Sequence, residues 1–91
     1  MYVRMVTIEV VPSKIDEFLS IYRAEQVPAL QAAQGFHEAQ VLTDAHTGKV
    51  IGLTVWETEA DAKAAPARNA KYGDLIVKAG ALEYYELSVQ V

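Results

Sequence analysis

Two histidines are the side chains best suited by type to proton transfer near neutral pH. His37 follows Phe36 at the start of an expected strand, and its imidazole makes it the leading candidate for a general base. The alternative is a partly exposed histidine at a strand end without a functional role. His46 lies in a turn segment and is interpreted as an ordinary turn residue. Neither has a carboxylate or cysteine partner at metal-ligand spacing, so the sequence predicts no metal site.

The neighbours of Trp56 on its face of the expected strand are small, which leaves space beside the aromatic ring. Thr54 and Gly52 share its face of the expected strand, because every second side chain of a strand points the same way. Small neighbours make room either for a ligand or for the close approach of a helix. Trp56 is equally explained as a core residue whose indole N–H finds a nearby acceptor.

Composition excludes several classes of function. The 91 residues are expected to form a single domain over residues 1–91. A net charge of −4 without any run of Lys or Arg argues against binding to nucleic acid or to an anionic membrane. The absence of cysteine removes disulfides and thiolate chemistry. No signal core, membrane span or glycine-rich phosphate loop is present, so we expect a cytoplasmic protein without a cofactor.

The elements that must position these residues alternate between strand and helix. Ser13 and Thr58 are the expected N-caps of two helices, and Pro28 and Pro66 are expected to break or kink them. The expected strands are residues 2–11, 36–44, 49–57 and 82–91; the expected helical segments are residues 13–27, 29–33, 58–65 and 67–79.

Three glycines are expected to mark where elements end. Gly35 and Gly80 follow the two helical regions, and Gly35 is placed to end its helix in the left-handed conformation. Gly48 closes the hairpin connection of residues 44–48, where a positive φ is needed. The resulting order is strand, helix, strand, strand, helix, strand.

This order predicts an α+β, ferredoxin-like sandwich, in which two helices cover one face of a four-stranded antiparallel sheet. The other face should then be polar if water covers it. The segment of residues 50–56 is instead apolar on both sides, and 52% of the chain is apolar. A second copy of the same sheet is the simplest cover, so the sequence predicts a homodimer.

Several short segments together resemble the antibiotic-biosynthesis-monooxygenase-like (ABM) domains, in particular the strand that ends in Trp-Glu and runs into an acidic, alanine-bearing helix. The segments are Gly35-Phe36, Leu42-Thr43-Asp44, Thr47-Gly48-Lys49-Val50 and Trp56-Glu57-Thr58-Glu59-Ala60-Asp61-Ala62. The resemblance implies a dimeric α/β barrel. It also implies oxidation of quinols or polycyclic phenols by oxygen without a cofactor, or haem degradation in another branch of the family.

Oxygenation without a cofactor requires a base, donors that stabilise the substrate anion, and an apolar pocket. The resemblance places Trp56 in such a pocket, and the tyrosines of the helices offer hydroxyl groups, although Tyr22 also belongs to an apolar helix stripe. Arg4 is a further possible donor. The catalytic candidates are His37, Trp56 and Tyr72; the substrate-binding candidates are Tyr22, Arg23, Thr54, Arg68 and Asn69.

Haem degradation is not expected. The haem-degrading branch resembles this chain at Trp56, but it also uses an asparagine on the first strand and a histidine one helical stretch after the tryptophan. The first strand here contains no asparagine, and Pro66 lies about where that histidine would be.

Two hypotheses of different classes follow. The first is a cofactor-independent monooxygenase that acts on a quinol or polycyclic phenolic small molecule. The second is a non-catalytic, small-molecule-binding or stress-associated dimer on the same scaffold, because one fold hosts many functions.

Overall fold

The computed structural model describes all residues, 1–91, as a four-stranded sheet with a helical layer on one face. The strands are β1 (Tyr2–Val10), β2 (Phe36–Thr43), β3 (Lys49–Trp56) and β4 (Ile76–Glu86). They are ordered β2-β3-β1-β4, and every neighbouring pair is antiparallel. This is the α+β, ferredoxin-like arrangement that the sequence predicts.

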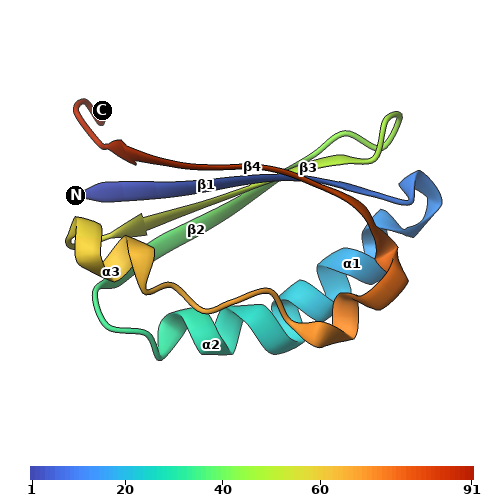
Figure 1. Ribbon diagram of the computed structural model, residues 1–91, viewed down its shortest axis with the longest axis horizontal. Helices are drawn as coiled ribbons and strands as arrows, with labels where there is room; N and C mark the ends of the chain where they lie inside the picture. The colour runs from blue at the N-terminus through green and yellow to red at the C-terminus, as the bar shows by residue number, and fades with distance from the viewer.

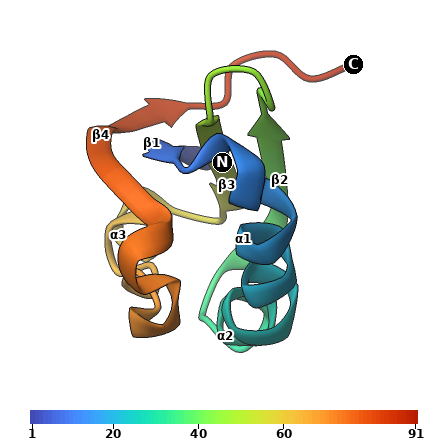
Figure 2. The same cartoon turned by 90° about the vertical axis from the view of Figure 1, so that its right-hand side faces the viewer.

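Helical segments cover one face of this sheet in two parallel lanes (Figures 1 and 2). The first lane contains α1 (Ile15–Ile21), a π-helical turn (Tyr22–Gln26) and α2 (Val27–Gln31). The second contains α3 (Glu59–Lys63) and a 3₁₀ stretch (Ala70–Leu75). None of these helices is both long and apolar enough to cross a membrane.

The first helical region differs from its prediction at the N-cap, and its α-helical pattern is interrupted just before Pro28. Ser13 lies inside a 3₁₀ turn (Pro12–Lys14) and makes no capping hydrogen bond, so the helix starts only at Ile15. Pro28 does not end the helix, because the π turn that precedes it changes the hydrogen-bond pattern and α2 continues to Gln31. Gly35 then takes a φ of 78°, as predicted.

The second helical region is much shorter than predicted. Thr58 caps α3 by accepting a hydrogen bond from the backbone N–H of Asp61, which confirms that prediction. The expected helix over residues 67–79 is wrong. Gly73 breaks the segment with a φ of 49°, and Ile76 begins the strand that pairs with β1 instead.

The last strand is shifted toward the N-terminus relative to its prediction. β4 spans Ile76–Glu86, whereas the sequence predicts a strand over residues 82–91. Val10 pairs with Ile76, and two register irregularities along β1 keep the long strand aligned. Residues after Glu86 form no regular element, although the Leu87 N–H still donates to the Met1 carbonyl.

The hydrophobic core lies between the helical layer and the sheet and has two parts. The larger cluster gathers around Phe18 and Tyr72, whose rings stack at 4.6 Å between centroids. The smaller cluster consists of Leu30, Trp56 and Ala62. No helix covers the other sheet face (Figure 1).

Candidate functional site

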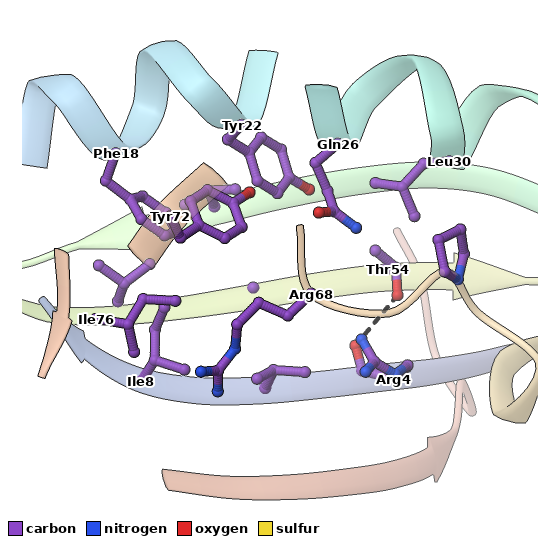
Figure 3. A pocket seen from close by; sticks show the side chains of 15 residues that line it. Arg4, Ile8, Phe18, Tyr22, Gln26, Leu30, Thr54, Arg68, Tyr72 and Ile76 are labelled. Carbon is purple, nitrogen blue, oxygen red and sulfur yellow. Dashed lines mark hydrogen bonds between the residues drawn. The ribbon is translucent and has the colours of Figure 1, made fainter. Parts of the chain in front are cut away.

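A cavity of about 110 Å³ lies between the two core clusters, beneath the helical layer and above the sheet (Figure 3). An engineered apolar cavity of about 150 Å³ binds benzene, so this smaller space holds only part of an aromatic compound, and the rest of such a compound would extend out of it. Its lining is mostly apolar. The fifteen lining residues are Arg4, Val6, Ile8, Phe18, Tyr22, Gln26, Leu30, Val41, Val50, Gly52, Thr54, Pro66, Arg68, Tyr72 and Ile76.

The sheet forms the floor of the cavity through alternate residues of β1 and β3, with one residue each from β2 and β4. Gly52 lies in the middle of this floor on β3, where it pairs with Val6 of β1 and Val41 of β2. A Cβ atom built on Gly52 meets no other atom within 4 Å. The missing side chain therefore contributes directly to the empty space.

One row of side chains from the first helical lane forms the roof. Phe18, Tyr22, Gln26 and Leu30 all project toward the sheet (Figure 3). The second lane closes the side with Tyr72 and with Arg68, which comes from the irregular segment between α3 and the 3₁₀ stretch. Because Arg68 is exposed, the cavity opens to solvent at this side.

The two tyrosines present neutral hydroxyl groups to the cavity. Burial raises the pKa of Tyr22, and burial followed by the proximity of Tyr22 raises the pKa of Tyr72 to about 12. Neither hydroxyl hydrogen-bonds to another group of the chain. Every side-chain polar atom that is fully buried does have a partner, so these two hydroxyl oxygens are not fully buried. Both oxygens therefore reach accessible space, where they are protonated at neutral pH and able to donate.

Two guanidinium groups supply positive charge at the same cavity. Arg4 and Arg68 line it, and neither takes part in any of the ion pairs of the chain, which are His37–Glu57, Lys63–Glu59 and Lys71–Glu25. The protein carries 12 acidic and 8 basic residues, so acidic partners are not scarce. Guanidinium groups without a carboxylate partner are available to an anionic ligand.

Trp56 lies behind the cavity and does not line it. Its side chain is fully buried against Leu30 and Ala62, and its indole N–H donates to Thr54 Oγ1 at 2.8 Å. Thr54 in turn donates to the Arg4 carbonyl at 3.4 Å and lines the cavity. The tryptophan thus reaches the cavity only through the threonine hydroxyl.

His37 lies away from the cavity on the surface. Its Nε2 is 2.5 Å from Glu57 Oε2, and the two side chains are 40% and 60% exposed. The base role predicted for His37 stays a prediction, and the cavity lining itself contains no histidine, aspartate or glutamate.

The structure therefore brings together four of the predicted site residues and separates the other four. Tyr22, Thr54, Arg68 and Tyr72 line the cavity; His37, Trp56, Arg23 and Asn69 do not. Arg23 is exposed, and the Asn69 side chain accepts a hydrogen bond from the Lys71 N–H within its own turn. Their predicted substrate-binding roles stay predictions.

Sequence reasoning missed Gln26 and gave little weight to Arg4. Gln26 follows Tyr22 by four residues, so the helical spacing of the apolar stripe was a signal for it. Arg4 alternates with apolar residues on β1, and a charge at such a position needs a partner. In the structure, Arg4 lines the cavity and forms no ion pair with an acidic side chain.

The family follows from a sequence comparison. The family model described as antibiotic biosynthesis monooxygenase (ABM) matches residues 1–69. The chain belongs to the ABM family. This membership agrees with the resemblance seen in the strand that ends at Trp56 and with the observed sheet order. No protein with a curated description matches the ABM chain significantly.

Solved structures show the same fold in distant relatives of this ABM protein. The haem degrader MhuD of Mycobacterium tuberculosis, solved with two haems in its active site, is 20% identical, with a TM-score of 0.76 over 100% of this chain and 99% of that one. A protein described as a candidate antibiotic biosynthesis monooxygenase from Bordetella bronchiseptica is 14% identical, with a TM-score of 0.76 and 97% of each chain covered. A conserved protein of Methanosarcina mazei has a TM-score of 0.72 at 14% identity, over 93% and 91% of the chains.

Proposed function

We propose that this ABM protein is a cofactor-independent monooxygenase of a quinol or polycyclic phenolic small molecule, which binds in the helix–sheet cavity. One observation carries the proposal: two guanidinium groups and two neutral tyrosine hydroxyls converge on a cavity whose lining is mostly apolar. Apolar walls suit the fused rings of the substrate, and the polar groups suit a phenolate oxygen.

The chemistry begins with ionisation of the bound phenol. Arg4 and Arg68 place positive charge beside it, which favours the anionic form and lowers the pKa of the substrate. No carboxylate or imidazole lines the cavity, so the proton leaves to solvent at the open side near Arg68. Tyr22 and Tyr72 donate hydrogen bonds to the anion because their raised pKa values keep them protonated.

The ionised substrate then reduces molecular oxygen, which is the co-reactant. For an anthrone, the anion transfers one electron to oxygen, the resulting radicals combine at the ring carbon, and loss of water leaves a carbonyl group. The balance is one CH₂ group and one O₂ consumed, one C=O group and one H₂O formed. The protein supplies binding, charge and exclusion of bulk water, and undergoes no redox change itself.

Haem is not the substrate that we propose, although the related MhuD is described with haem bound. None of the fifteen lining residues is a histidine, cysteine or methionine. The only phenols that could reach an iron atom, Tyr22 and Tyr72, have raised pKa values, whereas tyrosine binds iron as its phenolate. These residues do not fit a haem iron.

The absence of a base from the lining favours a second candidate function, a binding protein without turnover. Both candidates predict the same occupied cavity, and they differ only in whether oxygen is consumed. The test is oxygen uptake by purified protein with 1,8-dihydroxyanthrone and with a naphthohydroquinone, compared with the buffer rate.

A cavity-filled variant provides the matched control for this test. Gly52→Val places a β-branched side chain in the empty floor, where nothing lies within 4 Å, so the sheet is expected to remain intact. Uptake by the wild type that disappears in Gly52→Val supports oxygenation in the cavity. Tight binding without uptake supports the second candidate, and the absence of both contradicts the proposed site.

We further propose that the protein works as a homodimer joined through the bare face of the sheet. That face carries Met5, Leu42, Ile51, Leu53 and Tyr85, which point away from the cavity by strand alternation. Leu42 and Tyr85 are about half exposed. Light scattering at micromolar concentration tests this: a dimer mass is expected, and a monomer mass contradicts the proposal.

A further inference from the structure

The roof of the cavity is a row of residues spaced by four. Phe18, Tyr22, Gln26 and Leu30 all face the sheet, although they span twelve residues of helix (Figure 3). An α-helix turns by about 100° per residue, so twelve residues advance about 120° beyond three full turns. In a regular α-helix, Leu30 would therefore point well away from Phe18.

The π turn at Tyr22–Gln26 removes this rotation. Within it, the Val27 N–H donates to the Tyr22 carbonyl, five residues back instead of four. Such a turn holds one residue more than an α-turn, so the helix advances as if only eleven residues separated the ends, about 20° beyond three turns. All four side chains then lie in one row.

Both ends of the row are anchored in the core. The Phe18 ring stacks on Tyr72 at 4.6 Å, and Leu30 packs with Trp56 and Ala62 in the smaller cluster. Each anchor residue is 4% exposed. Because both ends are fixed, a change of helical register would change the direction of the side chains between them, which are Tyr22 and Gln26 at the cavity.

Pro28 accounts for the position of the π turn. In a regular α-helix the N–H of residue 28 would donate to the carbonyl of Ala24, but proline has no N–H and its ring crowds that carbonyl. A local π turn is one of the few ways in which a helix accommodates such a residue without ending. The helix indeed continues to Gln31.

We propose that Pro28 is a positioning residue of the ligand site. It favours the π turn, and the π turn keeps Tyr22 and Gln26 on the cavity face between two fixed ends. The identity of the ligand rests on the proposed function, whereas the effect of Pro28 on the helix does not. The row itself has apolar ends and a hydrogen-bonding centre, which suits a fused-ring compound whose oxygen atoms lie near its middle.

The test compares two variants with the wild type. Pro28→Ala restores the missing N–H and permits a regular α-helix, which cannot satisfy both anchors at once. The second variant combines Pro28→Ala with deletion of Ala24, so that a regular helix again brings both ends to the same face. Pro12→Ala, in the exposed 3₁₀ turn outside the cavity, is the control for loss of a proline.

Two readouts are needed. The first requires no ligand: nuclear Overhauser contacts between the Phe18 and Tyr72 rings and between Leu30 and the Trp56 indole report whether both anchors are satisfied. The second is binding of 1,8-dihydroxyanthrone without oxygen, followed through the emission of Trp56, the single tryptophan. In Pro28→Ala we expect one anchor contact to be lost and binding to weaken about tenfold or more. In the deletion variant, the lost anchor contact and the binding affinity should both be restored.

A merely structural role for Pro28 would not predict rescue by a deletion. The inference is overturned if Pro28→Ala keeps both anchor contacts and binds normally, or if the deletion variant fails to recover the contacts. If the wild type does not bind the anthrone, the proposed function fails. The anchor contacts alone then decide whether Pro28 sets the register.

Discussion

The two sides of the core bury their aromatic residues in different ways. Trp56 is fully buried, and its single polar hydrogen is used within the protein by Thr54. Tyr22 and Tyr72 bury their rings next to the cavity, but their hydroxyls find no partner in the chain. The Trp56 side is thus complete without a ligand, whereas the tyrosine side retains hydrogen-bonding capacity. Unused polar groups beside open space are the better guide to a binding site.

Substitution of Trp56 should give the largest effect, and it should act on stability. Trp56→Ala removes a fully buried side chain and is expected to cost about 3–5 kcal/mol of unfolding free energy. A domain of this size has about 5–15 kcal/mol in total, so unfolding in denaturant, followed by circular dichroism, would shift strongly. The milder Trp56→Phe should bind 1,8-dihydroxyanthrone nearly as the wild type does, as followed by calorimetry because this variant has no tryptophan emission. Lost binding at unchanged stability would contradict the distinction between the two sides.

Replacement of Arg68 should act on binding instead. Arg68→Ala removes charge-assisted hydrogen bonds of about 1.5–3 kcal/mol, which corresponds to about 10- to 100-fold in the dissociation constant of the anthrone anion. Because Arg68 is exposed, its removal should leave the melting temperature within about 2 °C. Arg23→Ala is the informative comparison, because Arg23 is exposed and lies outside the cavity. If Arg23→Ala weakens anthrone binding as much as Arg68→Ala does, the binding site extends beyond the cavity to Arg23, as the sequence predicts.

Thr54 connects the two sides, so its substitution should affect both. Thr54→Val leaves the buried Trp56 N–H without an acceptor and is expected to cost about 1–3 kcal/mol of stability. Thr54→Ser keeps the hydroxyl and should cost clearly less. Thermal unfolding of the two variants provides the measurement, and equal losses would mean that the methyl group of Thr54 contributes as much to stability as its hydroxyl.

The hydroxyl of Tyr72 should have the smallest effect at neutral pH. Tyr72→Phe should change the stability little, because that hydroxyl has no partner in the chain, and should weaken anthrone binding by about 3- to 10-fold.

At alkaline pH, the ionisation of Tyr72 should lower the unfolding free energy of the ligand-free protein. Its pKa is about 12 in the folded state, above the value of 10.0 of an unperturbed tyrosine. The stabilisation is therefore fully present below pH 10.0 and is lost as the pH rises toward about 12, because ionisation favours the unfolded chain. Unfolding free energies measured between these limits should fall less steeply in Tyr72→Phe. Identical slopes would show that another group causes the loss.

Most of the fold could be predicted from the sequence, because its signals are local. The β-branched runs, the Thr58 cap and the positive φ angles of Gly35 and Gly48 each act within a few residues. The segment after Pro66 could not be predicted from helical spacing. There, pairing of Ile76 with Val10 and the break at Gly73 decide the structure, and the first of these depends on a residue distant in sequence.

The candidate site could be predicted only in part for the same reason. Residue type identified Tyr22, Tyr72 and Arg68, but it also favoured His37, which lies on the surface outside the cavity, in contact with Glu57. Resemblance to the family favoured Trp56, which local sequence cannot distinguish from a core residue. Whether a polar group meets a partner or open space is determined by the packing of several elements together.

The empty position at Gly52 has a consequence for the evolution of this protein. Glycine inside a strand costs roughly 0.5–1 kcal/mol relative to alanine, and nothing within 4 Å would oppose a larger residue there. Many single substitutions at this codon should therefore make the protein more stable and less able to hold a ligand. Selection for thermal tolerance alone would close the cavity, so a glycine at this position in a lineage reports continued selection for ligand binding.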